Sequence, residues 1–238
     1  MLSLTTFRNY NYIKIITLNS KKGMHFIKRT YGLLIFSVAF LAIFSKWQGS
    51  IWFMGLKPLT TILLLLLPLS SWASAPRAFR RGMVTGLFFC LVGDVFLLWD
   101  HFFLFGLGAF LVAHLLFAYT FSNTFGFSKS LGVLAGVLCV AVLVFVLLYP
   151  HLGTLQLPVL GYMLAIAFMV WQGVGAYFKN KNKPTALLAM GALCFMLSDS
   201  LLGYNKFVAP LPWESFWVLG SYWLALYGLA KATTFRLY

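Results

Sequence analysis

The chain has 238 residues, of which 61% are hydrophobic and only 9% are charged, and its mean hydropathy is +0.89. This composition excludes an ordinary soluble domain, in which about a quarter of the residues are charged. The formal net charge of +14 does not indicate a nucleic-acid partner, because the Lys and Arg residues lie between apolar runs and not beside solvent-facing aromatic residues. The sequence therefore predicts an all-α, polytopic membrane protein.

Residues 1–30 differ from the rest of the chain, since they are polar and basic and contain no acidic residue. We expect them to form a cytoplasmic extension that precedes one membrane domain, residues 31–238. The extension is either disordered or not translated, because Met24 begins a stretch, MHFIKRTYGLLIF, that already has the basic flank of a first helix. A cleaved signal peptide is less favoured, because no small-residue cleavage site follows the first apolar run.

Eight apolar runs follow, and crossing a bilayer takes about 20 residues each. The runs cover residues 31–45, 57–73, 82–99, 102–122, 131–149, 155–178, 185–204 and 214–235. The connections between them are brief and no internal linker separates them. The predicted fold is therefore a bundle of about eight transmembrane helices.

The Lys and Arg residues are distributed unevenly over the connections. With the N-terminus inside, fifteen of them lie on the cytoplasmic side, and only Lys46, Lys57 and Lys206 lie on the outer side. Cytoplasmic connections of membrane proteins carry an excess of Lys and Arg. The asymmetry predicts a multi-pass protein of the cell (inner) membrane with both termini in the cytoplasm.

Two of the four acidic residues, Asp94 and Asp199, fall inside predicted spans, close to their outer ends. A charged residue at the centre of a span costs about 2.5–3.5 kcal/mol on the insertion scale, so its presence requires a reason. One reason is a structural hydrogen bond or ion pair between helices, and the other is chemistry. Asp100 and Glu214 lie at span ends, where a solvated or interfacial role is expected.

Small residues accompany both intramembrane carboxylates. The stripe before Asp94 comprises Gly82, Gly86, Cys90 and Gly93, and the stripe before Asp199 comprises Gly191, Cys194 and Ser198. Small residues at such spacings let transmembrane helices approach closely. We therefore expect both carboxylates to lie on closely packed helices and to share one polar pocket.

Further polar side chains are candidates for the same pocket. His114 lies in the middle of the fourth predicted span, Lys57 begins the second, Asn205 and Lys206 close the seventh, and Tyr222 lies in the eighth. Each has a structural alternative: an intramembrane His is often a satisfied structural group, and a terminal Lys often extends to the lipid headgroups.

Three stretches resemble the signatures of the YhhN-like family, the lysoplasmalogenases: LKPLTTILLLLLPLSSW (56–72), LVGDVFLLWDHFFLFGLGAFLVAHLLFAYTF (91–121) and LSDSLLGYNKF (197–207). The resemblance covers residues 31–238 and depends on the motifs Lys-Pro, Gly-Asp, Gly-x-x-Ala-Phe-x-x-x-His and Ser-Asp in that order. Phe117 stands where the family usually has Tyr, and Leu226 stands where it usually has Gln. These departures bear on headgroup preference more than on the chemistry.

The resemblance implies a membrane hydrolase that cleaves the vinyl ether bond of a lysoplasmalogen, a lysophospholipid within the membrane, to a fatty aldehyde and a glycerophospho-alcohol. No cofactor and no bound metal are implied. Vinyl ether hydrolysis needs a proton donor, and burial beside a second carboxylate keeps a carboxyl group protonated near neutral pH. The expected catalytic residues are Asp94 and Asp199 in either order, with His114 orienting water or relaying a proton. The expected substrate contacts are Lys57, Asn205, Lys206 and Tyr222.

Two other classes of function remain open at this stage. A proton-coupled transporter of a lipid or amphipathic solute would also use intramembrane Asp and His, but the chain has no evident sequence halves or paired broken helices. A metal-dependent lipid hydrolase would bind a divalent ion through His114, Asp94 and Asp199. It is the less favoured class, because no His-x-x-x-His spacing accompanies these residues.

Overall fold

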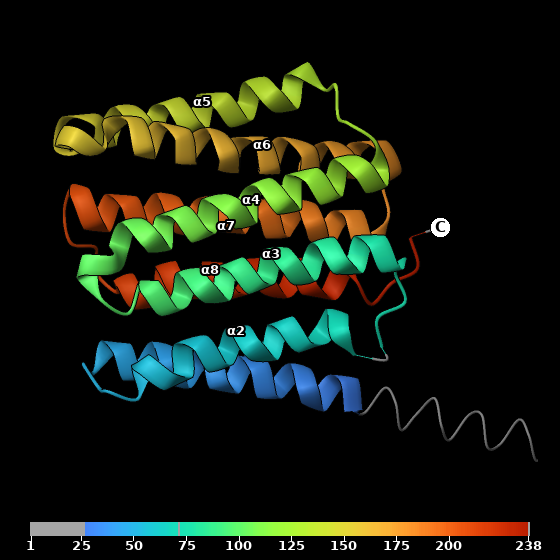
Figure 1. Cartoon of the computed structure of the whole chain (residues 1–238), viewed down its shortest axis with the longest axis horizontal. Helices are drawn as coiled ribbons and strands as arrows, with labels where there is room; N and C mark the ends of the chain where they lie inside the picture. The colour runs from blue at the N-terminus through green and yellow to red at the C-terminus, as the bar shows by residue number, and fades with distance from the viewer. Residues whose placement is uncertain (1–26, 71, 238) are drawn as a thin grey trace, which may run out of the picture.

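The computed structural model describes residues 27–70 and 72–237, and within them the helices run side by side in one bundle (Figure 1). Their bounds are Ile27–Trp47, α2 (Phe53–Leu69), α3 (Arg77–Phe96), α4 (Phe103–Phe125), α5 (Leu131–Leu148), α6 (Gln156–Asn180), α7 (Lys183–Phe207) and α8 (Glu214–Ala232). Short 3-10 helices at Asp100–Phe102, Tyr149–His151 and Gly153–Leu155 lie in the connections. The described part of the chain contains no β-strand.

The all-α, polytopic membrane fold predicted from the sequence is confirmed. Each of the eight predicted spans overlaps one helix, and five described helical segments are long and apolar enough to cross a membrane: Ile27–Trp47, Asp100–Phe125, Leu131–His151, Gly153–Asn180 and Lys183–Phe207. α2 is apolar but shorter, at 17 residues. It begins four residues before the predicted start, because a turn closed by the Phe53 N–H and the Ser50 carbonyl (3.2 Å) leads directly into it. Residues 1–26 of the predicted extension lie outside the described residues.

The small-residue stripes lie where helices meet. On α3, a Cβ at Gly93 would lie 2.6 Å from the Phe110 ring of α4, and one at Gly86 would overlap the ring of Phe117. On α7, a Cβ at Gly191 would lie 2.9 Å from the backbone carbonyl of Ala225 on α8. The α3–α4 and α7–α8 pairs therefore depend on glycine for their close approach, as predicted, and both intramembrane carboxylates lie on such helices.

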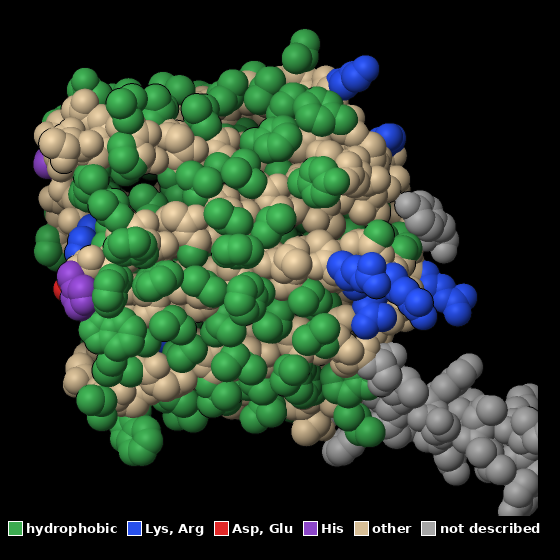
Figure 2. All heavy atoms as spheres, viewed as in Figure 1, with side chains coloured by type: hydrophobic (Ala, Val, Ile, Leu, Met, Phe, Trp, Pro, Cys, Tyr) green, Lys and Arg blue, Asp and Glu red, His purple; other side chains and the backbone are tan. Residues whose placement is uncertain are grey.

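The two ends of the bundle differ in charge. On the face that Figure 2 shows, hydrophobic side chains cover the bundle, and a group of Lys and Arg lies over the start of α3, at the end where the described chain finishes. Arg77, Arg80 and Arg81 occupy the first turns of α3 at this end. Such a distribution is typical of a membrane protein whose basic end faces the cytoplasm.

Candidate functional site

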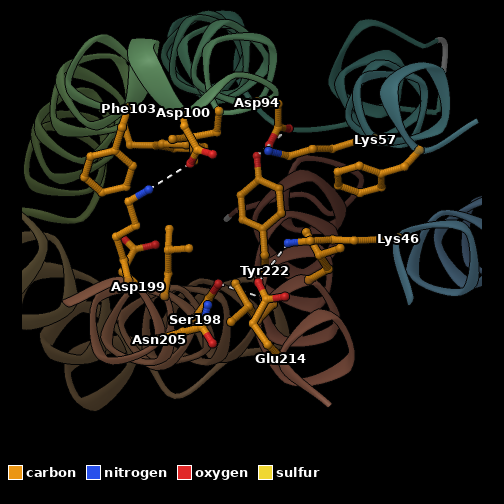
Figure 3. A pocket seen from close by; sticks show the side chains of 17 residues that line it. Lys46, Lys57, Asp94, Asp100, Phe103, Ser198, Asp199, Asn205, Glu214 and Tyr222 are labelled. Atoms are coloured by element: carbon orange, nitrogen blue, oxygen red, sulfur yellow. Dashed lines mark hydrogen bonds and ion pairs between the residues drawn. The ribbon is translucent and has the colours of Figure 1, made fainter. Parts of the chain in front are cut away.

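A cavity of about 180 Å³ lies at the end of the bundle away from this arginine group, between α2, α3, α4, α7 and α8 (Figure 3). All four acidic residues of the chain line it, together with the three lysines that the sequence places at the outer side. These charged residues are Asp94, Asp100, Asp199, Glu214, Lys46, Lys57 and Lys206. The shared pocket expected for Asp94 and Asp199 is therefore present, and acidic and basic side chains face each other in it.

Asp94 is buried on α3 and has donors from two other helices. The hydroxyl of Thr61 on α2 donates to its Oδ2 at 2.5 Å, and the hydroxyl of Tyr222 on α8 donates to the same oxygen at 2.8 Å. Lys57 Nζ, also on α2 and only 5% exposed, lies 3.5 Å from the other oxygen, Oδ1. An ammonium and two hydroxyl donors stabilise negative charge on a carboxylate.

Asp199 lies on α7 in different surroundings. The Tyr162 hydroxyl of α6 donates to its Oδ2, and His114 Nε2 lies 3.6 Å from the same oxygen. No lysine or arginine of the described chain forms an ion pair with it. The two carboxylates thus line one cavity but have separate partners: Asp94 faces a lysine and two hydroxyl groups, whereas Asp199 faces a tyrosine and a histidine.

His114 lies deeper than expected. It is fully buried on α4, with its ring edge-on to Phe195 (4.6 Å between centroids) and Tyr162 (5.2 Å), and it does not line the cavity. Phe110, one helical turn earlier on the same face of α4, lines the cavity in its place. Among the described residues neither ring nitrogen has a hydrogen-bond partner. The nearest polar group recorded for the imidazole is Asp199. His114 therefore contacts a carboxylate that lines the cavity but does not line the cavity itself.

The mouth of the cavity contains two ion pairs. Lys206 Nζ lies 2.8 Å from Asp100 Oδ1, and Lys46 Nζ lies 2.8 Å from Glu214 Oε1. Asn205 lines the cavity too, but its side-chain oxygen accepts a hydrogen bond from the Leu211 N–H at 2.8 Å and so anchors the connection between α7 and α8. Asp100 and Glu214 are thus each paired with a lysine at the mouth of the cavity.

Sequence reasoning did not single out Tyr162 and Thr61, the hydroxyl partners of the two aspartates. The available signals were weak: a Tyr in the middle of an apolar span, and a Thr-Thr pair before five leucines. Phe117 and Leu226, where the sequence departs from the family pattern, are both fully buried and neither is among the residues that line the cavity. In residues 27–70 and 72–237, no group of three or more His, Cys, Asp or Glu side chains is placed to hold a metal ion.

The amino-acid sequence is similar to those of several curated proteins named lysoplasmalogenase. Lysoplasmalogenase TMEM86B of Sus scrofa is 37% identical over 135 residues, which cover 56% of this chain and 55% of that protein. Lysoplasmalogenase of Mycobacterium bovis (strain ATCC BAA-935 / AF2122/97) is 38% identical over 138 residues (54% and 51%), and lysoplasmalogenase TMEM86A of Bos taurus is 32% identical over 151 residues (59% and 60%). The matches therefore span a little over half the length of these curated relatives.

No solved structure matches the chain. The model of the YhhN family matches residues 52–233. This match covers most of the chain and includes both intramembrane aspartates, their hydroxyl partners and His114. The chain belongs to the YhhN family.

Proposed function

We propose that this protein is a membrane hydrolase that cleaves the vinyl ether bond of lysoplasmalogens to a fatty aldehyde and a glycerophospho-alcohol. The names of its relatives support this activity. The observation that carries the proposal is the gathering of two intramembrane carboxylates and three lysines in one cavity. Such a cavity combines a proton donor, a counter-ion for a cationic intermediate and positive charge for a phosphate group.

The reaction begins with proton transfer to the alkene. A carboxylic acid protonates the β-carbon of the vinyl ether, and the oxygen donates electrons to give an oxocarbenium ion. Water adds to the carbon next to oxygen and loses a proton to the carboxylate, which restores the acid. The resulting hemiacetal then breaks its carbon–oxygen bond to give the aldehyde and the free hydroxyl group. One water is consumed, and acid–base catalysis of this kind contributes about 10²–10⁴-fold.

The partners of the two carboxylates favour Asp199 as the acid and Asp94 as the ionised member. Asp94 faces an ammonium and two hydroxyl donors, which stabilise negative charge. Asp199 has no Lys or Arg partner among the described residues and lines the same cavity as Asp94, and a second carboxylate in one cavity favours the protonated state of the member without a cation. Ionised Asp94 would then stabilise the oxocarbenium ion across the cavity.

The other candidate residues divide between positioning and binding. Lys57 and Tyr222 hold Asp94, and His114 and Tyr162 hold Asp199, so these four are positioning residues. Lys46 and Lys206 at the mouth are better placed to bind the phosphate of the headgroup, because their partners, Glu214 and Asp100, lie at the outer end. A phosphate is the natural competitor for an exposed ammonium.

The test is aldehyde release by the purified full chain in detergent, with a lysoplasmalogen as substrate. Asp199→Asn preserves size and hydrogen-bonding capacity but removes the transferable proton, and it should lower kcat by about 10²–10⁴-fold without lowering the melting temperature. Asp94→Asn should lower kcat to a similar extent per folded molecule. Wild-type turnover by Asp199→Asn would refute the assignment. A proton-coupled transporter would instead move labelled lysolipid across the bilayer of a proteoliposome without releasing aldehyde, and this outcome would favour the transporter alternative.

A further inference from the structure

An apolar cavity adjoins the polar one. A second cavity, of about 50 Å³, is enclosed by α4, α5, α6 and α7 and shares Phe103, Asp199 and Leu202 with the first. Apart from Asp199, its polar lining is limited to the hydroxyls of Tyr162 and Ser200. The Tyr162 hydroxyl is engaged by Asp199, and the Ser200 hydroxyl donates to the carbonyl of Met196 on its own helix at 2.7 Å. The second cavity therefore offers mainly hydrocarbon surface to a molecule that reaches past Asp199.

The apolar cavity in turn adjoins a groove on the side of the bundle. The groove has a volume of about 790 Å³, lies between α5 and α7 and shares Val144, Met196 and Ser200 with the apolar cavity. Most of its lining is aliphatic, including Val137 and Leu193. The polar cavity, the apolar cavity and the groove thus lie one after another along α7. Together they form a path from the polar mouth, past Asp199, to the side of the bundle.

The position of α5 explains why this groove is open. α5 lies at one edge of the bundle, at the top of Figure 1, and packs mainly against α6. Only Val137, Ala141 and Leu148 of this helix are buried, whereas Val140 and Val142 are 47% and 59% exposed. Because α5 packs mainly on α6, a gap remains between α5 and α7, and in a membrane the hydrocarbon chains of lipids would fill this gap.

We infer that this path is the binding site for the single hydrocarbon chain of the substrate, which enters sideways from the bilayer between α5 and α7. The inference rests on the proposed function, because it takes the substrate to be a single-chain lysolipid. The chain lies along α7 with its first carbons beside Asp199, and the headgroup meets the lysines at the mouth.

The first experiment changes the width of the path. Val144 lines both the apolar cavity and the groove, whereas Val142, two residues away on α5, is exposed and lines neither. In Val144→Trp, kcat/KM for a long-chain lysoplasmalogen should fall by about 10–100-fold relative to kcat/KM for a short-chain one, because a displaced chain misplaces the vinyl ether. In Val142→Trp, the ratio should match that of the wild type. Equal loss for both chain lengths, or equal effects of the two variants, would overturn the inference.

A second experiment locates the chain without requiring turnover. A lysophospholipid with a diazirine at the end of its chain is photolysed with the full chain in detergent. Labelling within 131–144 and 193–200 should be displaced by unlabelled lysophospholipid, and this displaceable labelling should be lost in Val144→Trp but kept in Val142→Trp. Labelling that is indifferent to competitor, or equal in both variants, would overturn the chain site. Displaceable labelling without aldehyde release would refute only the proposed function.

Discussion

At the scale of single residues, the environment of Asp94 contains a buried ion pair. Lys57 and Asp94 are 5% and 1% exposed, and their charged atoms lie 3.5 Å apart. Removing one member of such a pair leaves a buried charge without compensation, which typically costs about 3–5 kcal/mol, whereas replacing both members costs much less. The pair thus links α2 to α3. Its contribution to stability can be measured apart from the proposed catalysis by replacing Lys57 first and then both residues.

Lys57→Met should lower the free energy of unfolding by about 3–5 kcal/mol, because Asp94 then remains buried without its cation. Adding Asp94→Asn to Lys57→Met should restore a large part of this loss. Reversible unfolding in mixed micelles measures both values. Lys206→Met is the control, because the side chain of its partner Asp100 is 95% exposed and an exposed ion pair contributes little. The free energy of unfolding of this variant should stay close to the wild-type value. A wild-type transition for Lys57→Met would contradict the coupling.

At the scale of helices, hydropathy predicts which segments span the membrane but not how each side chain is oriented. Intramembrane hydroxyls usually bond their own helix, as the Thr60 hydroxyl does with the Leu56 carbonyl, yet the adjacent Thr61 bonds Asp94. The two threonines look alike in the sequence, and only the rotation of α2 against α3 distinguishes them. Asp94 and Asp199 were predictable because a carboxyl group in a span has a large cost, which a hydroxyl lacks.

The α7–α8 contact provides a test at this scale. Gly191→Ala should destabilise the bundle by roughly 1–3 kcal/mol, because the new methyl group would lie 2.9 Å from a backbone carbonyl that cannot move without shifting α8. Gly108→Ala on α4 is the matched control: a Cβ added there would meet no atom outside its own stretch of helix within 4 Å, and helix propensity alone should stabilise the protein by up to about 1 kcal/mol. Unfolding in mixed micelles should give opposite signs for the two variants; equal signs would contradict this account of the contact.

At the scale of the whole molecule, charge is divided between one end that is almost purely basic and another where acidic and basic residues meet in a cavity (Figures 2 and 3). With the basic end in the cytoplasm, the cavity opens on the opposite side. The headgroup would then be bound from the outer leaflet, while the groove beside α5 extends toward the inner one. This orientation is a proposal that labelling can test.

Single cysteines in a chain that lacks the native ones should report the orientation. His151→Cys, between α5 and α6, should react with a membrane-impermeant maleimide in intact cells. Ser74→Cys, between α2 and α3, should react only after the membrane is opened, because the basic end faces the cytoplasm. Both side chains are exposed, so each position is accessible to the reagent. The reverse labelling pattern would invert the proposed topology.

The bond between Tyr222 and Asp94 also sets the order in which the site is completed during synthesis. The two residues are 128 positions apart, whereas Thr61 precedes Asp94 by only 33. At ~5–20 residues per second, the ribosome adds Tyr222 roughly 6–26 s after Asp94. During that interval α2 alone supplies partners to the carboxylate, and Lys57 makes the nascent α2–α3 hairpin locally neutral. A chain interrupted before α8 would carry the Lys57–Asp94 ion pair but an incomplete cavity, so insertion into the membrane and completion of the candidate site are separate events in time.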